Sequence, residues 1–307
     1  MNANKKFFSK IGFNYLAYSI ASILFLIILS NIIAVIRPEI LNNINIATII
    51  TAICNYVLPL PILLFLMRKL DSTEIKKNNL GFKTFLKYLC ITFTLMWIGN
   101  ITGTIITNLL SFTIQNDIAN PIQNLINSTD LWLNLILISL IGPIFEEVIF
   151  RKILIDRTIK YGPLASILVS AIIFGLIHGN LNQFCYTVLV GGFFAYVYIK
   201  TGQIKYSIGL HIILNMLGSV LSMIVNNSAV NLSNAFNTTD LAILVFYFIL
   251  ILIALFVGIY TLVEYIQKKR KQKNSIDLKI IKPVFLNAGM ICFIVFYIIR
   301  MALQILS

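Results

Sequence analysis

Charge is scarce in this sequence. Only 11% of its 307 residues are Asp, Glu, Lys or Arg, whereas a soluble domain carries about 25%. Hydrophobic residues make up 59% of the chain, and the mean hydropathy is +0.91. This composition excludes an ordinary soluble domain and indicates a polytopic membrane protein.

Cysteine is also rare, and its spacing carries no motif. Cys54, Cys90, Cys185 and Cys292 lie singly inside apolar segments, with no C-x-x-C pair. None of the intervals between them is typical of a metal site. The four residues are therefore predicted to be small apolar packing residues.

Apolar runs close to the ~20 residues that cross a bilayer as a helix recur along the whole chain. Nine spans are predicted, at residues 11–36, 44–67, 84–111, 131–150, 163–179, 182–199, 204–225, 241–266 and 284–306. The fifth and sixth are short and nearly continuous. We therefore expect an all-α bundle of about eight or nine transmembrane helices.

The formal net charge of +13 would suit a nucleic-acid partner, but its distribution argues against one. When alternate loops are assigned to one side of the membrane, every Lys and Arg except Arg37 and Arg300 falls in or beside loops of that side. The positive-inside rule then places the N-terminus in the cytoplasm of a multi-pass cell-membrane protein. Arg300 lies inside the last apolar run and receives no functional assignment.

Apart from Arg300, the ionisable residues that interrupt apolar runs all fall in residues 131–225. A charged side chain at the bilayer centre costs roughly 2.5–3.5 kcal/mol on insertion scales, so such residues mark a candidate functional site. We therefore divide the chain into N-terminal transmembrane helices with an external segment (1–130), a four-helix core (131–225) and C-terminal transmembrane helices (226–307).

The stretch GPIFEEVIFRKILIDR, residues 142–157, carries two adjacent carboxylates inside an apolar helix. Glu147 and Arg151 are four residues apart and can pair on one helix face. Glu146 points about 100° away from Glu147 and has no cation at that spacing. One carboxylate is therefore accounted for by an ion pair, and Glu146 is left over.

The two histidines of the chain lie in the same block. FGLIH places Phe174 and His178 four apart, and HIILN does the same for His211 and Asn215. A single intramembrane histidine is most often a hydrogen-bonded packing residue. Two of them beside a spare carboxylate and a buried asparagine point instead to a reaction site.

Peptide hydrolysis is a reaction that this set of side chains can perform. It needs a base for water, an acid for the leaving amine and donors for the oxyanion. A partly desolvated glutamate holds a proton more tightly than an exposed one and is the better base. No Ser or Cys lies in an arrangement typical of a nucleophile with its base.

The ordered motifs EEVIFR, FGLIH and HIILN resemble the CAAX protease and bacteriocin-processing (CPBP) family, also called Abi or type II CAAX endopeptidases, whose pattern is EExxxR, FxxxH and HxxxN. The resemblance covers roughly residues 130–225. It implies an intramembrane protease in which Glu146 and His178 activate water. Glu147 and Arg151 would form an orienting pair, with Phe174 a structural residue, and His211 and Asn215 would stabilise the oxyanion.

The resemblance also implies the kind of substrate. Such enzymes cleave membrane-associated peptides, including prenylated C-terminal tails, and bacterial members are linked to peptide processing and bacteriocin immunity. The family has been described both as metal-dependent and as glutamate-dependent. We expect no cofactor; the alternative is zinc held by Glu146, His178 and His211.

Two rival functions remain open from the sequence. A transporter would use the buried Glu and His residues as an ion pathway, but no internal repeat is present. A scaffold or bacteriocin-immunity protein would keep the fold only for binding.

The protease interpretation makes a geometric demand, because upright helices would separate Glu146 from His178 by roughly 10 Å or more. The interpretation requires that the fourth helix continues past Arg151, or that the fifth helix begins below the membrane or tilts steeply.

Overall fold

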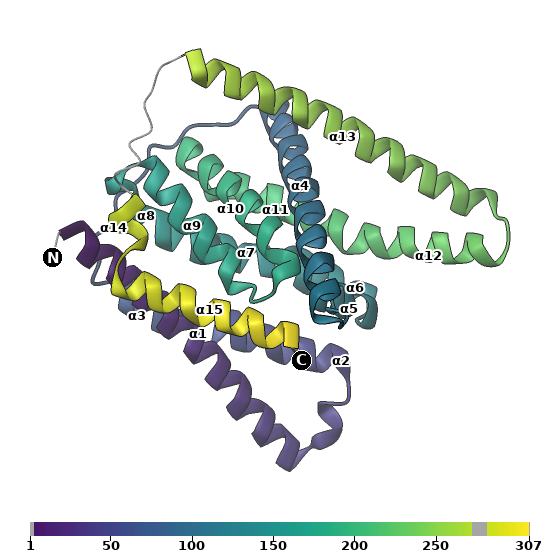
Figure 1. The fold of residues 1–307 in the computed structure, drawn as a ribbon, viewed down its shortest axis with the longest axis horizontal. Coiled ribbons are helices and arrows are strands. Elements are labelled where there is room, and N and C mark those ends of the chain that lie inside the picture. Colours follow the sequence, from purple (N-terminus) through teal and green to yellow (C-terminus); the bar gives the residue numbers. More distant parts are fainter. Residues whose placement is uncertain (1–2, 272–280, 307) are drawn as a thin grey trace.

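The computed structural model describes residues 3–271 and 281–306, and every regular element within these ranges is a helix. Eight helical segments of the described chain are long and apolar enough to cross a membrane. The predicted all-α polytopic fold is thereby confirmed (Figure 1). The elements are α1 (Ala3–Ile36), η1 (Pro38–Ile40), α2 (Ile44–Ala52), η2 (Ile53–Val57), α3 (Leu60–Met67), α4 (Phe82–Ile114), α5 (Pro121–Ser128), α6 (Leu131–Leu133), η3 (Asn134–Ile141), α7 (Gly142–Glu147), η4 (Val148–Ile153), α8 (Leu154–Thr158), η5 (Ile159–Tyr161), α9 (Pro163–Ile177), α10 (Leu181–Thr201), α11 (Ile204–Gly218), α12 (Val220–Asn234), α13 (Thr238–Lys271), α14 (Ile281–Phe285) and α15 (Ala288–Leu306).

The fifth predicted span is the one that does not reach membrane-crossing length. Helix α9 has 15 residues, starting at Pro163 and ending before His178. A proline at the first helical position starts a helix readily because its missing N–H has no partner there in any case. The helix ends because Gly179 adopts φ +65°, a left-handed conformation that terminates helices.

The fourth predicted span continues well past Arg151. One helical segment runs from Leu131 to Tyr161, as the shared site demanded. It is not a uniform α-helix, because the π-helical segments η3 and η4 flank α7. Such π-helical insertions occur often at functional sites.

Pro143 leaves one backbone carbonyl of the fourth span without an N–H donor from its own helix. The N–H of Gly142 donates to the carbonyl of Leu137, five residues back. In the same register the carbonyl of Ile138 would accept from residue 143, but proline has no N–H. The Ile138 carbonyl instead accepts from the Asn215 side chain of α11, with Nδ2 to O at 3.0 Å. The proline therefore frees a backbone acceptor that ties α11 to the fourth span.

The other neighbours of the fourth span are also tied to its backbone. Tyr15 of α1 donates to the carbonyl of Ile149 at 2.7 Å, and Ser170 of α9 donates to that of Phe150 at 2.9 Å. All of these groups are buried, where an unpaired polar atom would be costly. These hydrogen bonds fix the position of the helix that carries the two carboxylates.

Helix α15 lies along α1 although the two are at opposite ends of the chain (Figure 1). Their backbones meet at Gly12 and Gly289, where a Cβ on either residue would overlap the backbone of the other helix. The Gly289 N–H donates to Ser9 Oγ at 3.0 Å. Glycine is therefore required at both positions for this close approach.

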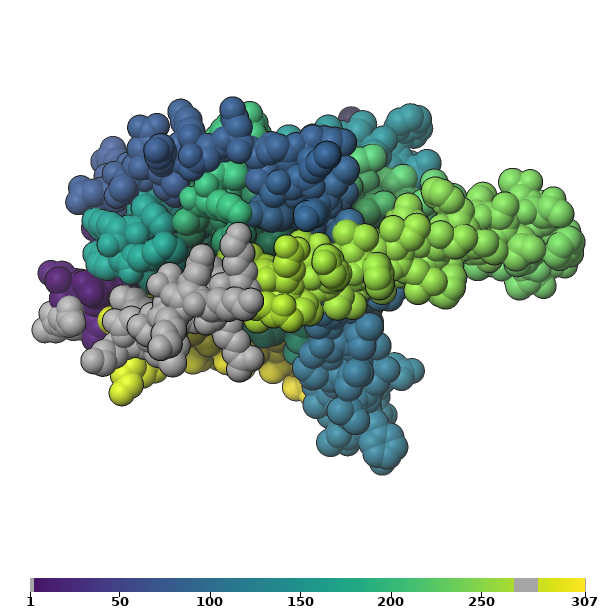
Figure 2. Space-filling view, turned by 90° about the horizontal axis from the view of Figure 1, so that it is seen from above, coloured from purple at the N-terminus to yellow at the C-terminus, as the bar shows by residue number. Residues whose placement is uncertain are grey.

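The α12–α13 pair forms the most extended part of the molecule. Figure 2 shows its connected end projecting away from the rest of the chain, and α13 packs back across α4. Most of its large apolar side chains, such as Phe246 and Phe256, are exposed. This surface is of the kind that faces lipid.

We expect Gly289→Val to lower the unfolding temperature of the protein, because the new side chain must push α15 away from α1. Overpacking of this kind costs about 1–3 kcal/mol. The measurement is thermal unfolding of the purified protein in detergent. Gly218→Ala is the matched control, since a Cβ at Gly218 meets nothing within 4 Å. Equal unfolding temperatures for the two variants would contradict the close approach.

Candidate active site

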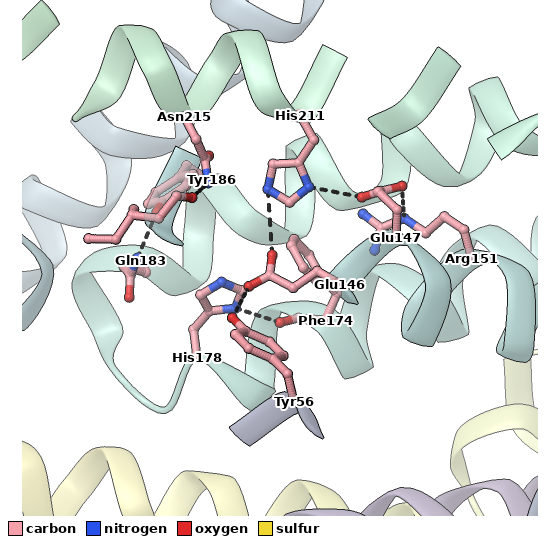
Figure 3. Close-up of polar contacts among 11 residues, drawn as sticks. Tyr56, Glu146, Glu147, Arg151, Phe174, His178, Gln183, Tyr186, His211 and Asn215 are labelled. Carbon is pink, nitrogen blue, oxygen red and sulfur yellow. Dashed lines mark hydrogen bonds and ion pairs between the residues drawn. The ribbon is translucent and has the colours of Figure 1, made fainter. Parts of the chain in front are cut away.

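The side chains singled out from the sequence meet in one cavity of about 560 Å³. Its lining includes Glu146, His178, His211 and Asn215, which come from α7, the end of α9 and α11. Figure 3 shows them facing one another. Glu146 and His178 therefore share a cavity, as hydrolysis at this place requires; the roles of the individual residues stay predictions.

Glu147 and Arg151 form an ion pair in the protein interior. Both side chains are 0% exposed, and Arg151 Nε lies 3.2 Å from Glu147 Oε2. The two terminal guanidinium nitrogens have no hydrogen-bond partner among the described residues. The guanidinium instead lies 4.3 Å from the centre of the Phe174 ring, a cation–π contact that is strong when desolvated.

Gly191 of α10 makes room for this stack. A Cβ at residue 191 would overlap the Phe174 ring and come within 3.5 Å of Arg151 Nη2. The ring of Phe174 also meets the rings of His178 and His211 edge to face, with centroids 4.8 Å and 5.9 Å away. Phe174 therefore packs between the buried ion pair and both histidines.

His211 bridges the two adjacent carboxylates. Its Nδ1 lies 3.0 Å from Glu147 Oε1, and its Nε2 lies 3.5 Å from Glu146 Oε2 (Figure 3). Because Glu147 is paired with Arg151 it acts as an acceptor, so Nδ1 carries the proton. Nε2 then has a lone pair in the neutral ring and becomes a donor only in the imidazolium. The link from His211 to Glu147 was not predicted from the sequence, which paired Glu147 with Arg151 alone.

Glu146 keeps a route to the cavity, with 14% of its side chain exposed. Its Oε1 accepts a hydrogen bond of 2.6 Å from the hydroxyl of Tyr56, in the π-helical segment η2. The Tyr56 ring stacks on Phe145 at a centroid distance of 5.7 Å. The sequence analysis missed Tyr56. Its polar neighbour Asn55 interrupts the second apolar run, but no spacing rule connects either residue to a carboxylate 90 positions later.

His178 is fixed by the turn that follows α9. Its Nδ1 lies 2.8 Å from the Phe174 carbonyl, which can only accept, so Nδ1 carries the proton and Nε2 has the lone pair. Asn180 donates to the His178 carbonyl at 3.0 Å and caps α10. The histidine ring lies beside Glu146 in Figure 3. In the described chain the two side chains share no hydrogen bond, and both line the cavity.

Asn215 is already partly engaged. One N–H of its amide donates to the Ile138 carbonyl, which leaves the second N–H and the carbonyl oxygen of the side chain for the cavity. Two further polar residues of α10 border the same cavity, where Gln183 Nε2 donates to the Tyr186 hydroxyl at 2.8 Å. These α10 side chains were not predicted from the sequence.

The zinc alternative requires three ligands that converge on one point. Among the described residues no group of three or more His, Cys, Asp or Glu side chains is arranged to hold a metal ion. Glu146 and His211 face each other, and Nδ1 of each histidine is turned to a protein oxygen. Metal-bound histidines also donate their second ring N–H to a protein oxygen, so these contacts leave the metal-free and the zinc forms to be separated by experiment.

The fold and the site together define a helical membrane protein with a carboxylate between two histidines. Residues 128–217, which contain all three motifs, match the family described as type II CAAX prenyl endopeptidase Rce1-like. The predicted CPBP-family resemblance is confirmed over this segment. The "putative membrane peptidase YdiL" of Bacillus subtilis (strain 168) is 36% identical over 84 residues, which are 27% of this chain and 34% of that protein. The similarity therefore spans about a third of that relative. No solved structure matches the chain.

The buried pair leads to a prediction about stability. We expect Glu147→Gln to destabilise the protein by about 3–5 kcal/mol, because it leaves the Arg151 charge unpaired in the interior. In the double variant with Arg151→Met the unpaired charge is gone, so part of the loss should be recovered. Glu146→Gln is the control, since Glu146 is partly exposed and its one ion contact in the described chain is to His211.

Chemical denaturation in detergent, followed by intrinsic fluorescence, measures these differences. If Glu147→Gln and Glu146→Gln unfold at the same denaturant concentration, the buried pair does not stabilise the fold. If the double variant is no more stable than Glu147→Gln, the loss arises from another contact of Glu147, such as that to His211.

Proposed function

We propose that this chain is an intramembrane endopeptidase that hydrolyses a peptide bond in a membrane-associated peptide or protein. The observation that carries the proposal is Glu146, a partly exposed carboxylate on a cavity wall beside two histidines, with no Lys or Arg paired to it in the described chain. The motif resemblance and the similarity to a membrane peptidase support the same class.

Water is activated in the space between Glu146 and His178. The carboxylate of Glu146 takes one proton of the water, and the other is held by the lone pair on His178 Nε2. The resulting hydroxide attacks the substrate carbonyl carbon. The hydrogen bond from Tyr56 orients the Glu146 carboxylate, so that Oε2 is the oxygen left for the proton.

The oxyanion of the tetrahedral intermediate is stabilised from α11. In the imidazolium form, His211 donates from Nε2, while Glu147 accepts from Nδ1. The free N–H of Asn215 supplies the second donor. Before water is deprotonated, Glu146 and Glu147 are both ionised, and the imidazolium and Arg151 make the cluster neutral overall; in the intermediate the oxyanion replaces the charge of the protonated Glu146. Glu146 then passes its proton to the leaving amine as the C–N bond breaks.

The glutamate-type mechanism needs no metal, and the proposal is for an enzyme without a cofactor. The proposed substrate is membrane-associated, since the cavity lies among helices that can cross a membrane. The cytoplasmic N-terminus and the division of the chain at residues 130 and 225 are part of the same proposal. The competing proposal is a bacteriocin-immunity or scaffold protein that binds its partner through the same fold without cleaving it; an ion-coupled transporter is the third.

Glu146→Gln tests the proposal. The substitution keeps the shape of the side chain but removes the base, and loss of general base catalysis typically lowers a rate by about 10²–10⁴-fold. The measurement is cleavage of a quenched-fluorescent library of apolar peptides by the purified protein in detergent. The wild type and the variant are compared with and without a strong zinc chelator.

The controls separate the alternatives. Arg37→Gln removes an exposed charge whose one ion pair in the described chain is with Glu39, and this variant should cleave like the wild type. Cleavage that survives chelation but disappears in Glu146→Gln supports the glutamate-type protease. Loss of cleavage on chelation would favour the zinc alternative. Peptide binding without any Glu146-dependent cleavage would favour the scaffold function. Proton-coupled uptake of a solute into vesicles that contain the protein would favour the transporter.

A further inference from the structure

Arg300 is the cation in the last apolar helix that the proposed reaction leaves unused. It lies on α15 and lines the same cavity as Glu146. Among the described residues that form this lining, Arg300 is the one Lys or Arg and Glu146 the one Asp or Glu. The cavity therefore presents one negative and one positive side chain to whatever occupies it.

The Arg300 side chain lies against the turn that fixes His178. A Cβ on Gly179, the residue after His178, would be 3.1 Å from Arg300 Nε and 3.3 Å from its Cδ. Gly179 has φ +65°, a backbone conformation that glycine adopts without strain. Glycine is therefore favoured here both by the turn and by the close approach of Arg300. Arg300 is thereby placed next to the predicted catalytic turn, although it lies on the C-terminal helix α15.

In the described part of the chain, no carboxylate is paired with the Arg300 guanidinium. Among the described residues no Asp or Glu oxygen lies within 4.0 Å of the Arg300 guanidinium. Its neighbour in the described chain is Tyr297, which interacts with the guanidinium through its hydroxyl and whose ring centre is 5.9 Å from the guanidinium carbon. A cation within a membrane helix is costly to leave without an anion. Its position in the cavity wall makes a bound anion the natural partner.

Helix α15 is held in place around this part of the cavity. Gln304, one turn beyond Arg300, donates to the Ala119 carbonyl at 3.4 Å, and Asn182 of α10 donates to the same carbonyl at 3.1 Å. The close contact of Gly289 with α1 fixes the other end of α15. The position of Arg300 is therefore set by packing at both ends of its helix.

We propose that Arg300 binds a carboxylate of the peptide substrate and so selects peptides that carry an acidic group near the scissile bond. This inference rests on the proposed protease function. A guanidinium offers two parallel N–H donors that match a carboxylate. The free C-terminal carboxylate of a short tail and an Asp or Glu side chain both supply this chemistry. With Arg300 holding the anion, the peptide crosses the cavity past His178 and Glu146.

Paired peptides and charge-changing variants test this site. The probes are quenched-fluorescent apolar peptides of one sequence with a free C-terminal acid, an amidated C-terminus, or an amidated C-terminus and one internal Glu. The wild type should cleave at least one acidic form more efficiently than the amide without Glu. In Arg300→Gln that preference in kcat/KM should fall by about 10-fold to 100-fold, as for loss of a charged hydrogen bond.

Charge reversal separates recognition from folding. Arg300→Glu should prefer a peptide with a C-terminal aminoethyl amide, which is cationic, over the free acid. Arg300→Lys should retain part of the preference of the wild type. Arg37→Gln, which removes an exposed arginine away from the cavity, should leave the ratio unchanged. If both acidic peptides and the amide are cleaved equally well by the wild type, the proposal is wrong.

A binding measurement keeps the test independent of turnover. Fluorescence anisotropy of the same peptides with a neutral dye reports affinity for the Glu146→Gln protein in detergent, with and without Arg300→Gln. Absence of Glu146-dependent cleavage, together with Arg300-dependent binding of the acidic peptides, would defeat the protease function and keep the carboxylate site. Equal affinities for acid and amide would overturn the site itself. A third outcome is that Arg300→Gln lowers the affinity for added anionic lipid but not for the acidic peptides. The partner of Arg300 would then be a lipid phosphate, and the peptide site would be wrong.

Discussion

The buried pair of Glu147 and Arg151 is the interaction on which the site depends. Two charges with no exposed surface are stable in an apolar bundle only while they compensate each other. Their geometry determines more than their own position. Phe174 stacks on the guanidinium, and His211 is held by the remaining oxygen of Glu147. The ion pair thus orients one residue from each of the two other helices that carry the motifs.

The irregular backbone of the fourth span has a comparable role. In the interior of a regular α-helix each carbonyl already accepts one backbone N–H. The π-helical segments and Pro143 leave the Ile138 carbonyl for Asn215, while Tyr15 and Ser170 bond to the Ile149 and Phe150 carbonyls. In a medium without water these hydrogen bonds are the polar links that hold helices together. The motif residues are therefore positioned by backbone groups that no motif contains.

The sequence predicts the parts of this protein that depend on local spacing. Apolar length predicts the helices, and the i, i+4 interval predicts the Glu147–Arg151 pair, because both follow from the geometry of a single helix. Tyr56 and Arg300 could not be placed, since their contacts join segments far apart in the chain and no periodicity records such contacts. The length of α9 was overestimated because hydropathy does not register the left-handed Gly179 that ends it.

The two arginines of the apolar helices show that a position inside an apolar helix does not by itself assign a role. Arg151 is surrounded by its carboxylate and two aromatic rings, so its charge is used within the protein. Arg300 meets an aromatic ring and the edge of a turn but no carboxylate of the described chain, and it borders the cavity. The charge of Arg151 positions Glu147 and Phe174 within the helix bundle. The charge of Arg300 is left for a molecule that enters from outside, because an anion in the cavity is the partner that the surrounding helices do not provide.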